Sequence, residues 1–242
     1  MKKNKLVDDV QDKIIDMVVS RQQGGENVVG DYVFNEGELA KKFDVSRSTI
    51  REAVRSLEVR GFVERVHGVG IRLIDKSITV LTQSLSDMLM RIGVDYIEFL
   101  EVRRIIEVHA ARLAATRATD EFDAMQKSIR IMEDDNVSYN DYVEADLMFH
   151  SLVVKATKNK PLTALVKSYE FIIKNLILAS TSPDFRPEIT SGFHKKIYDS
   201  ISSRDPDGAE KAMTEHLNAT EINVKSLHGS LSHVFLKKSA KD

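Results

Sequence analysis

The stretch from Gly37 to Gly70, GELAKKFDVSRSTIREAVRSLEVRGFVERVHGVG, decides the fold of the N-terminal part of the chain. Two short helical segments, about 35–43 and 46–60, are separated by only a two-residue turn, which is typical of a helix-turn-helix. Beyond Gly61 the pattern changes to two short apolar runs around a glycine-bearing tip, which predicts a β-hairpin. The stretch therefore predicts a winged helix-turn-helix.

One face of the second helical segment is cationic. Arg47, Arg51 and Arg55 recur one turn apart, whereas apolar residues occupy another face. Between residues 46 and 72, six arginines stand against three glutamates, in a chain whose net charge is -2. Alternating Arg and Glu can also form a merely solvated helix face, but the preceding helix, the tight turn and the hairpin favour contact with nucleic acid.

The composition excludes several classes of protein. The chain has 242 residues, of which 42% are hydrophobic and 30% charged, so we expect two modest globular domains. Cysteine is absent, so disulfides and thiol chemistry are excluded, and any metal must be bound by His, Asp or Glu. No apolar run approaches the roughly 18 residues of a membrane span, and no signal-peptide pattern is visible, so we expect a cytoplasmic protein without a membrane partner.

The chain beyond Asp95 shows only helical patterns, broken by Pro- and Asn-containing turns. The expected helices cover about 95–117, 119–135, 138–157, 160–180, 187–203 and 206–227. The predicted fold class is mostly α: a winged helix-turn-helix with a small β wing, followed by an all-α antiparallel helical bundle. The expected domains are a winged helix at 1–75, a linker helix at 76–94, the bundle at 95–228 and a flexible tail at 229–242.

Over about residues 6–74 the quoted stretch resembles the winged-helix domain of GntR-type bacterial transcription regulators. The resemblance implies that the second helix of the motif enters the major groove of DNA and that the wing tip lies along the minor groove. The residues that it implies in DNA contact are Arg47, Ser48, Thr49, Arg51, His67 and Gly68. At position 37 the sequence departs from the family. Gly37 stands where the family often has an arginine that contacts DNA, so the usual operator preference of the family is not implied for this chain.

The bundle sequence contains residues that suit a metal ion. Asp146 and His150 are four residues apart on one helix, so a single cation can bridge them. His194 opens one predicted helix and His216 lies within the next, so an antiparallel return can bring them face to face. Each histidine alone is more often a core or surface residue than a ligand. Imidazoles with one carboxylate suit zinc, nickel or manganese.

Residues 95–226 resemble the FCD ligand-binding domain of the FadR subfamily of GntR regulators, in the words FLEVRRIIEVHAARLAA, EADLMFHSLVVKAT, FHKKIYDSI and AMTEHL. The resemblance implies a divalent metal, Zn²⁺ with Ni²⁺ or Mn²⁺ as alternatives, beside which an organic acid effector binds. Its implied ligands are Asp146, His150, His194 and His216. Arg103 matches the family's Glu-x-Arg, where it pairs either with an effector carboxylate or with a carboxylate of the bundle.

The expected protein is therefore a DNA-binding transcriptional regulator, a repressor of a metabolic operon, and not an enzyme. A homodimer is expected to read a palindromic operator and to respond to a small carboxylate or sugar acid. Two alternatives stay open at this point. The metal is purely structural in one, and in the other the chain is a helical metalloenzyme, although no general base accompanies the ligands.

Overall fold

The computed structural model describes residues 2–23, 33–180, 191–228 and 233–234. The chain divides into two compact units, residues 1–84 and 85–242, and the division falls within the predicted linker. Among the described helices, none is long and apolar enough to cross a membrane.

Two of the three helices described in the first unit begin at a capping residue. The three helices are α1 (Lys2–Gln23), α2 (Glu36–Phe43) and α3 (Arg47–Val59). Asn35 caps α2 in a capping box with Glu38, and Ser46 caps α3 by accepting a hydrogen bond from the backbone N–H of Thr49. Asp44 ends α2 in the left-handed conformation, with φ of 54°, so the helices are joined by the predicted two-residue turn.

A three-stranded antiparallel sheet completes the first unit. Its strands are β1 (Val33–Phe34), β2 (Val63–Val66) and β3 (Gly70–Leu73), in the order β1-β3-β2. The sequence predicts the β2–β3 hairpin but assigns the residues of β1 to a loop. Gly70 permits the additional pairing, because a Cβ atom at this position would lie 2.6 Å from the carbonyl oxygen of Phe34.

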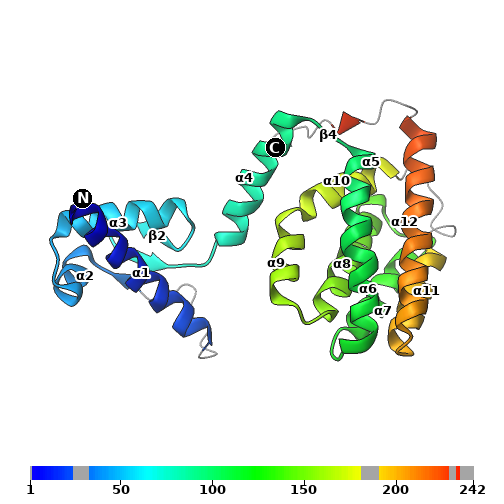
Figure 1. Cartoon of the computed structure of the whole chain (residues 1–242), viewed down its shortest axis with the longest axis horizontal. Coiled ribbons are helices and arrows are strands. Elements are labelled where there is room, and N and C mark those ends of the chain that lie inside the picture. Colours follow the sequence, from blue (N-terminus) through cyan, green and yellow to red (C-terminus); the bar gives the residue numbers. More distant parts are fainter. Residues whose placement is uncertain (1, 24–32, 181–190, 229–232, 235–242) are drawn as a thin grey trace. The chain divides into compact units, whose positions relative to one another are not determined.

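The core of the first unit lies between α1 and α3. Val10 and Ile14 of α1 are buried with Ile50, Val54 and Leu57 of α3. Figure 1 shows α1, α2 and α3 gathered beside the small sheet. The apolar face of α3 is thus used for packing, and its polar face stays at the surface.

The second unit is a helical bundle. Its helical elements, after α4 (Ser77–Ile92), are α5 (Tyr96–Arg103), the π-helix η1 (Arg104–Val108), α6 (His109–Arg117), α7 (Phe122–Met132), α8 (Tyr139–Ala156), α9 (Lys160–Ser168), α10 (Glu170–Ser180), α11 (Ser191–Ser202) and α12 (Pro206–His228). Helices α6, α8, α11 and α12 run side by side around a core that includes Phe149, Leu176, Ile197 and Leu217 (Figure 1).

Two expectations for the bundle differ from the structure, and a third lies partly outside the described residues. The helix predicted over 95–117 contains the π-turn η1, and the helix predicted over 160–180 is broken at Tyr169. Near this break the hydroxyl of Ser168 donates to the carbonyl of Leu165 at 2.6 Å, so a side chain competes with the backbone for that acceptor. The first four residues of the helix predicted over 187–203 lie outside the described residues.

A short two-stranded ladder joins the segment before α5 to the segment after α12. Strand β4 (Val94–Asp95) pairs antiparallel with β5 (His233–Val234). Residues 233 and 234 of the tail predicted over 229–242 take part in this pairing. The rest of the predicted tail lies outside the described residues.

Candidate metal centre and nucleic-acid interface

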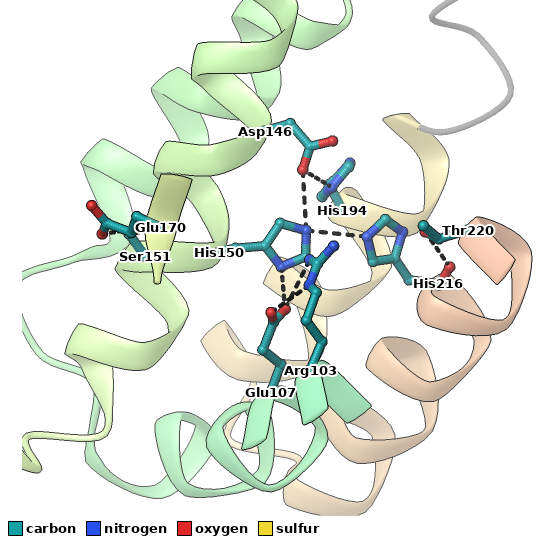
Figure 2. A network of polar contacts seen from close by, with 9 residues as sticks. All are labelled: Arg103, Glu107, Asp146, His150, Ser151, Glu170, His194, His216 and Thr220. Carbon is teal, nitrogen blue, oxygen red and sulfur yellow. Dashed lines mark hydrogen bonds and ion pairs between the residues drawn. The ribbon is translucent and has the colours of Figure 1, made fainter. Parts of the chain in front are cut away.

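Three helices bring four potential metal ligands together. Asp146 and His150 come from α8, His194 from α11 and His216 from α12, and one ligand atom from each lies within 4.8 Å of all the others. Nε2 of His150 lies 3.1 Å from Oδ1 of Asp146 and 3.1 Å from Nε2 of His216 (Figure 2). The same Oδ1 lies 3.4 Å from Nε2 of His194.

These separations fit a cation bound at the centre of the group. Ligand atoms about 2.1 Å from a zinc-sized ion stand roughly 3.0–3.4 Å from their neighbours in octahedral or tetrahedral geometry. All four side chains are buried, and among the described residues Oδ1 of Asp146 and Nε2 of His194 make close contacts but no well-aligned hydrogen bond. Because unpaired buried polar atoms are costly, a cation would satisfy both. The donor set therefore fits a divalent metal, and metal binding by it remains a prediction.

The electrostatics of two members of the cluster, Asp146 and His216, favour the protonation states that ligands need. Burial alone would raise the pKa of Asp146, but His194 and His150 hold it well below its ordinary value. Burial, with repulsion from His194 and His150, holds the pKa of His216 well below that of a free imidazole. Near neutral pH the group thus presents an ionised carboxylate and a neutral His216, which are the forms that bind metals.

A buried ion pair lies directly behind His150. Arg103 donates from Nε to Oε1 of Glu107 at 2.6 Å and from Nη2 to Oε2 at 3.1 Å, and both side chains are only 1% exposed. Oε2 of Glu107 lies 2.7 Å from Nδ1 of His150 (Figure 2). Of the two roles considered for Arg103, the structure shows the pairing with a bundle carboxylate, whereas effector contact remains a prediction.

Sequence reasoning missed Glu107. Its signal was the spacing of four residues from Arg103, which places a carboxylate and a guanidinium on one helix face. That face also carries Leu100 and Ala111, both fully buried. A charged pair that shares a helix face with core residues points to a buried site.

The start of α3 and the wing tip border one surface groove. This groove has a volume of about 710 Å³, and its lining includes Gly37, Arg47, Arg65, His67 and Gly68. Ser48 is also exposed, at the beginning of α3, and Gly68 sits at the wing tip with φ of 72° and open space around it. The structure thus places Arg47, Ser48, His67 and Gly68 at the surface, as contact with DNA requires.

Arg51 is exposed but already has an acidic partner. Its Nε donates to Oε2 of Glu36 at 2.6 Å, and its side chain is 63% exposed. Pairing through Nε directs the guanidinium while leaving its terminal nitrogens for a base or a phosphate. The position of Arg51 on α3 is compatible with its predicted role.

Thr49 is less accessible than the other residues implied in DNA contact. Its side chain is only 4% exposed, and its hydroxyl lies 2.9 Å from the hydroxyl of Ser46 at the helix cap. A buried hydroxyl that is already paired is less available to a base edge. Thr49 thus takes part in the capping of α3, and its contact with DNA remains a prediction.

Comparison with known proteins identifies the class. The family model for bacterial regulatory proteins of the gntR family matches residues 6–73, and that for the FCD domain matches residues 98–219. The chain is 31% identical over 206 residues to the uncharacterized HTH-type transcriptional regulator YcbG of Bacillus subtilis, with 85% of each chain covered. It is 31% identical over 205 residues to the Uxu operon transcriptional regulator of Escherichia coli, covering 81% of this chain and 77% of that one.

A solved structure agrees with these relatives. Streptococcus agalactiae GntR matches with a TM-score of 0.70 and 29% sequence identity, covering 89% of this chain and 99% of that chain. The fold and the relatives define a helix-turn-helix transcriptional regulator. The chain belongs to the GntR family and carries an FCD domain after its winged helix. The predicted fold class and regulator class are confirmed, and the metalloenzyme alternative is excluded because the family consists of regulators that bind operator DNA.

Proposed function

We propose that this chain represses a metabolic operon in response to a small carboxylate or sugar acid that binds at a metal in its FCD domain. The main support for this proposal is the buried cluster of Asp146, His150, His194 and His216, because it brings four potential metal ligands together inside the FCD domain of a DNA-binding regulator. Its similarity to a regulator named for one operon, the Uxu operon, supports control of an operon. Because its proposed target is operator DNA, we propose that the protein acts in the cytoplasm.

Operator recognition is assigned to α3 and the wing. Arg47 and Arg51 can pair bidentately with guanine or phosphate, and Ser48 can donate to a base edge or a phosphate oxygen. His67 and Gly68 at the wing tip suit contact with the minor groove or the backbone. A homodimer presents two such units, so its operator is a palindrome.

The metal is assigned to the four buried ligands. Zn²⁺ is the ion that three imidazoles and one carboxylate suit best, with Ni²⁺ and Mn²⁺ as the alternatives. When bound, such a cation supplies a Lewis acid to which a carboxylate can attach. A purely structural metal is the second candidate role, because the ligands join α8, α11 and α12.

Polar groups near the metal ligands can complete an effector site. Arg103 uses Nε and Nη2 for Glu107, so Nη1 is the nitrogen that an effector carboxylate would contact. The hydroxyl of Tyr169 is buried and has no hydrogen-bond partner among the described residues. Two such groups suit a ligand with both a carboxylate and a hydroxyl, as sugar acids have.

Regulation follows if the effector distinguishes two states of the protein. An acid that binds more tightly to the form with low operator affinity shifts the population toward that form, and release from DNA follows by thermodynamic linkage. An acid with equal affinity for both forms would bind without inducing transcription.

A thermal-shift screen of the full chain tests this function. Glucuronate, gluconate, lactate and citrate are added to zinc-loaded protein and to protein treated with a chelator. At least one acid is expected to raise the Tm of the zinc-loaded protein only. The same acid should release the protein from a duplex that the full chain itself selects from a random-sequence pool. If chelation lowers the Tm but leaves acid binding and duplex affinity unchanged, the metal is structural.

A further inference from the structure

We propose that Glu107 is a positioning residue for the metal site, which holds His150 in the tautomer whose Nε2 lone pair faces the cation. Arg103 in turn balances the charge of Glu107. The inference rests on the metal site proposed above but adds two residues that are not ligands. It concerns how the ligand set is held ready for the ion.

The two nitrogens of His150 face different partners. Nδ1 lies 2.7 Å from Oε2 of Glu107, and Nε2 lies 3.1 Å from Oδ1 of Asp146. A neutral imidazole carries only one N–H, and a carboxylate beside one nitrogen favours the proton there. With the proton on Nδ1, donated to Glu107, Nε2 has a free lone pair. In the opposite tautomer an N–H would point into the ligand group and exclude a cation.

Arg103 offsets the free-energy cost of burying the carboxylate of Glu107. An isolated ionised carboxylate is expensive in a protein interior, and the bidentate contacts at 2.6 and 3.1 Å offset that cost. Because Arg103 is paired in this way, Glu107 can remain ionised while it accepts from His150. The order of contacts is therefore guanidinium, carboxylate, imidazole and then the ligand group (Figure 2).

The backbone that carries Glu107 is tied to two of the helices that bear ligands. Glu107 belongs to the π-helix η1, a form that recurs at functional sites. The same turn carries Arg104, whose Nη2 donates to Glu221 at 2.8 Å and to Asn218 at 3.2 Å, both on α12 with His216. Through Glu107 it also contacts His150 on α8. The π-turn thus connects Glu107 to both helices.

Competition titration of the full chain with a zinc-binding dye tests the inference. Glu107→Gln is expected to weaken zinc binding by roughly 10- to 100-fold, because an amide favours neither tautomer of His150 as a carboxylate does. Glu121→Gln is the matched control. Glu121 is also a buried carboxylate of the bundle, only 3% exposed, but it pairs with Lys158 and not with a ligand. Its substitution should leave zinc affinity unchanged.

A second measurement separates positioning from general stability. Nitrogen-15 NMR of the zinc-loaded protein, with labelled histidine, should show His150 protonated at Nδ1 and metal-bound at Nε2. A spectrum with zinc on Nδ1 of His150 would overturn the inference.

Glu107→Gln leaves Arg103 without its partner, which can prevent folding. The double variant Arg103→Gln with Glu107→Gln removes both charges and keeps the test decisive. If either variant folds and binds zinc as tightly as the wild type, the proposed role of Glu107 is contradicted, whereas the metal site itself is not. Absence of zinc binding by the wild-type chain contradicts the proposed metal site itself, and the inference falls with it.

Discussion

The guanidinium of Arg47 lies over Gly37: a Cβ atom at position 37 would stand 3.2 Å from Nη2 of Arg47. Gly37→Ala should therefore displace Arg47 by a few tenths of an ångström and weaken operator binding several-fold. The same Cβ atom would stand 3.2 Å from Oδ1 of Asn35, which caps α2, so crowding of the cap opposes the gain of up to about 1 kcal/mol by which helices favour alanine over glycine, and we expect only a small net change in stability. Fluorescence anisotropy with a selected operator duplex, together with thermal unfolding, measures the two effects separately.

Gly192 provides the control for this substitution. It is the second residue of α11, as Gly37 is of α2, and a Cβ atom there would have no atom of the described residues within 4 Å. Gly192→Ala should leave operator affinity unchanged. Equal effects of the two substitutions on DNA binding would show that Gly37 has no special relation to Arg47.

Arg51→Ala should weaken operator binding while the protein stays folded. Loss of a base or phosphate contact costs about 1–3 kcal/mol of binding free energy. Its exposed ion pair with Glu36 contributes at most about 1 kcal/mol to stability. Gel-shift titration checks the first value and urea unfolding the second. Arg130→Ala, an exposed arginine of α7, is the control, and unchanged affinity in the Arg51 variant would remove this residue from the interface.

His194→Ala should lower the metal content of the purified protein, because it removes one of four converging ligands. His109→Ala is the matched control, since His109 is exposed and lies outside the cluster. Elemental analysis of both variants after dialysis gives the comparison. Full occupancy in the His194 variant would exclude this residue as a ligand.

Glu121→Gln should destabilise the fold in a pH-dependent way. Burial alone would raise the pKa of Glu121, but Lys158 and the backbone N–H groups of Thr119 and Asp120 lower it below 4.5. Because the folded-state pKa is depressed, ionised Glu121 stabilises the protein above the ordinary carboxyl pKa. That stabilisation is lost as the pH falls through the folded-state value.

Chemical denaturation across this pH range checks the expectation. At pH 7 the variant should lose about 1–3 kcal/mol of unfolding free energy, which is typical of a charged hydrogen bond. The difference from the wild type should shrink as the pH falls below 4.5. Glu133→Gln, at an exposed position, should change stability by less than about 0.5 kcal/mol at either pH. A loss for Glu121→Gln that is independent of pH would contradict the assignment.

Local signals in the sequence were sufficient for much of the fold. The capping residue Ser46 and the two-residue turn before it depend on neighbours only a few positions away, as do the helical patterns. Strand β1 escaped prediction because it has only two residues, and its partners in β3 lie beyond both helices of the motif. The break at Tyr169 likewise depends on packing that periodicity does not report.

Prediction of the candidate sites was limited in the same way: local spacing is visible in the sequence, whereas contacts between helices are not. Spacing alone put Asp146 and His150 on one helix face, but their convergence with His194 and His216 requires three helices to meet. Glu107 was missed because the atom that it contacts in the site, Nδ1 of His150, belongs to a different helix. The burial of Thr49 could not be predicted, because its position in the motif says nothing of burial, which the packing of α3 decides.

The ladder between β4 and β5 has a consequence for the order of folding. Val94 pairs with Val234, so this contact closes a ring of roughly 140 residues, for which the loop entropy alone costs about 4 kcal/mol. Two-residue strands cannot offset such a cost from an unfolded chain. The ring must therefore close after the bundle has formed, when α12 has already carried the chain back toward β4. Slow hydrogen exchange at these backbone amides would then mark molecules in which folding of the bundle is complete.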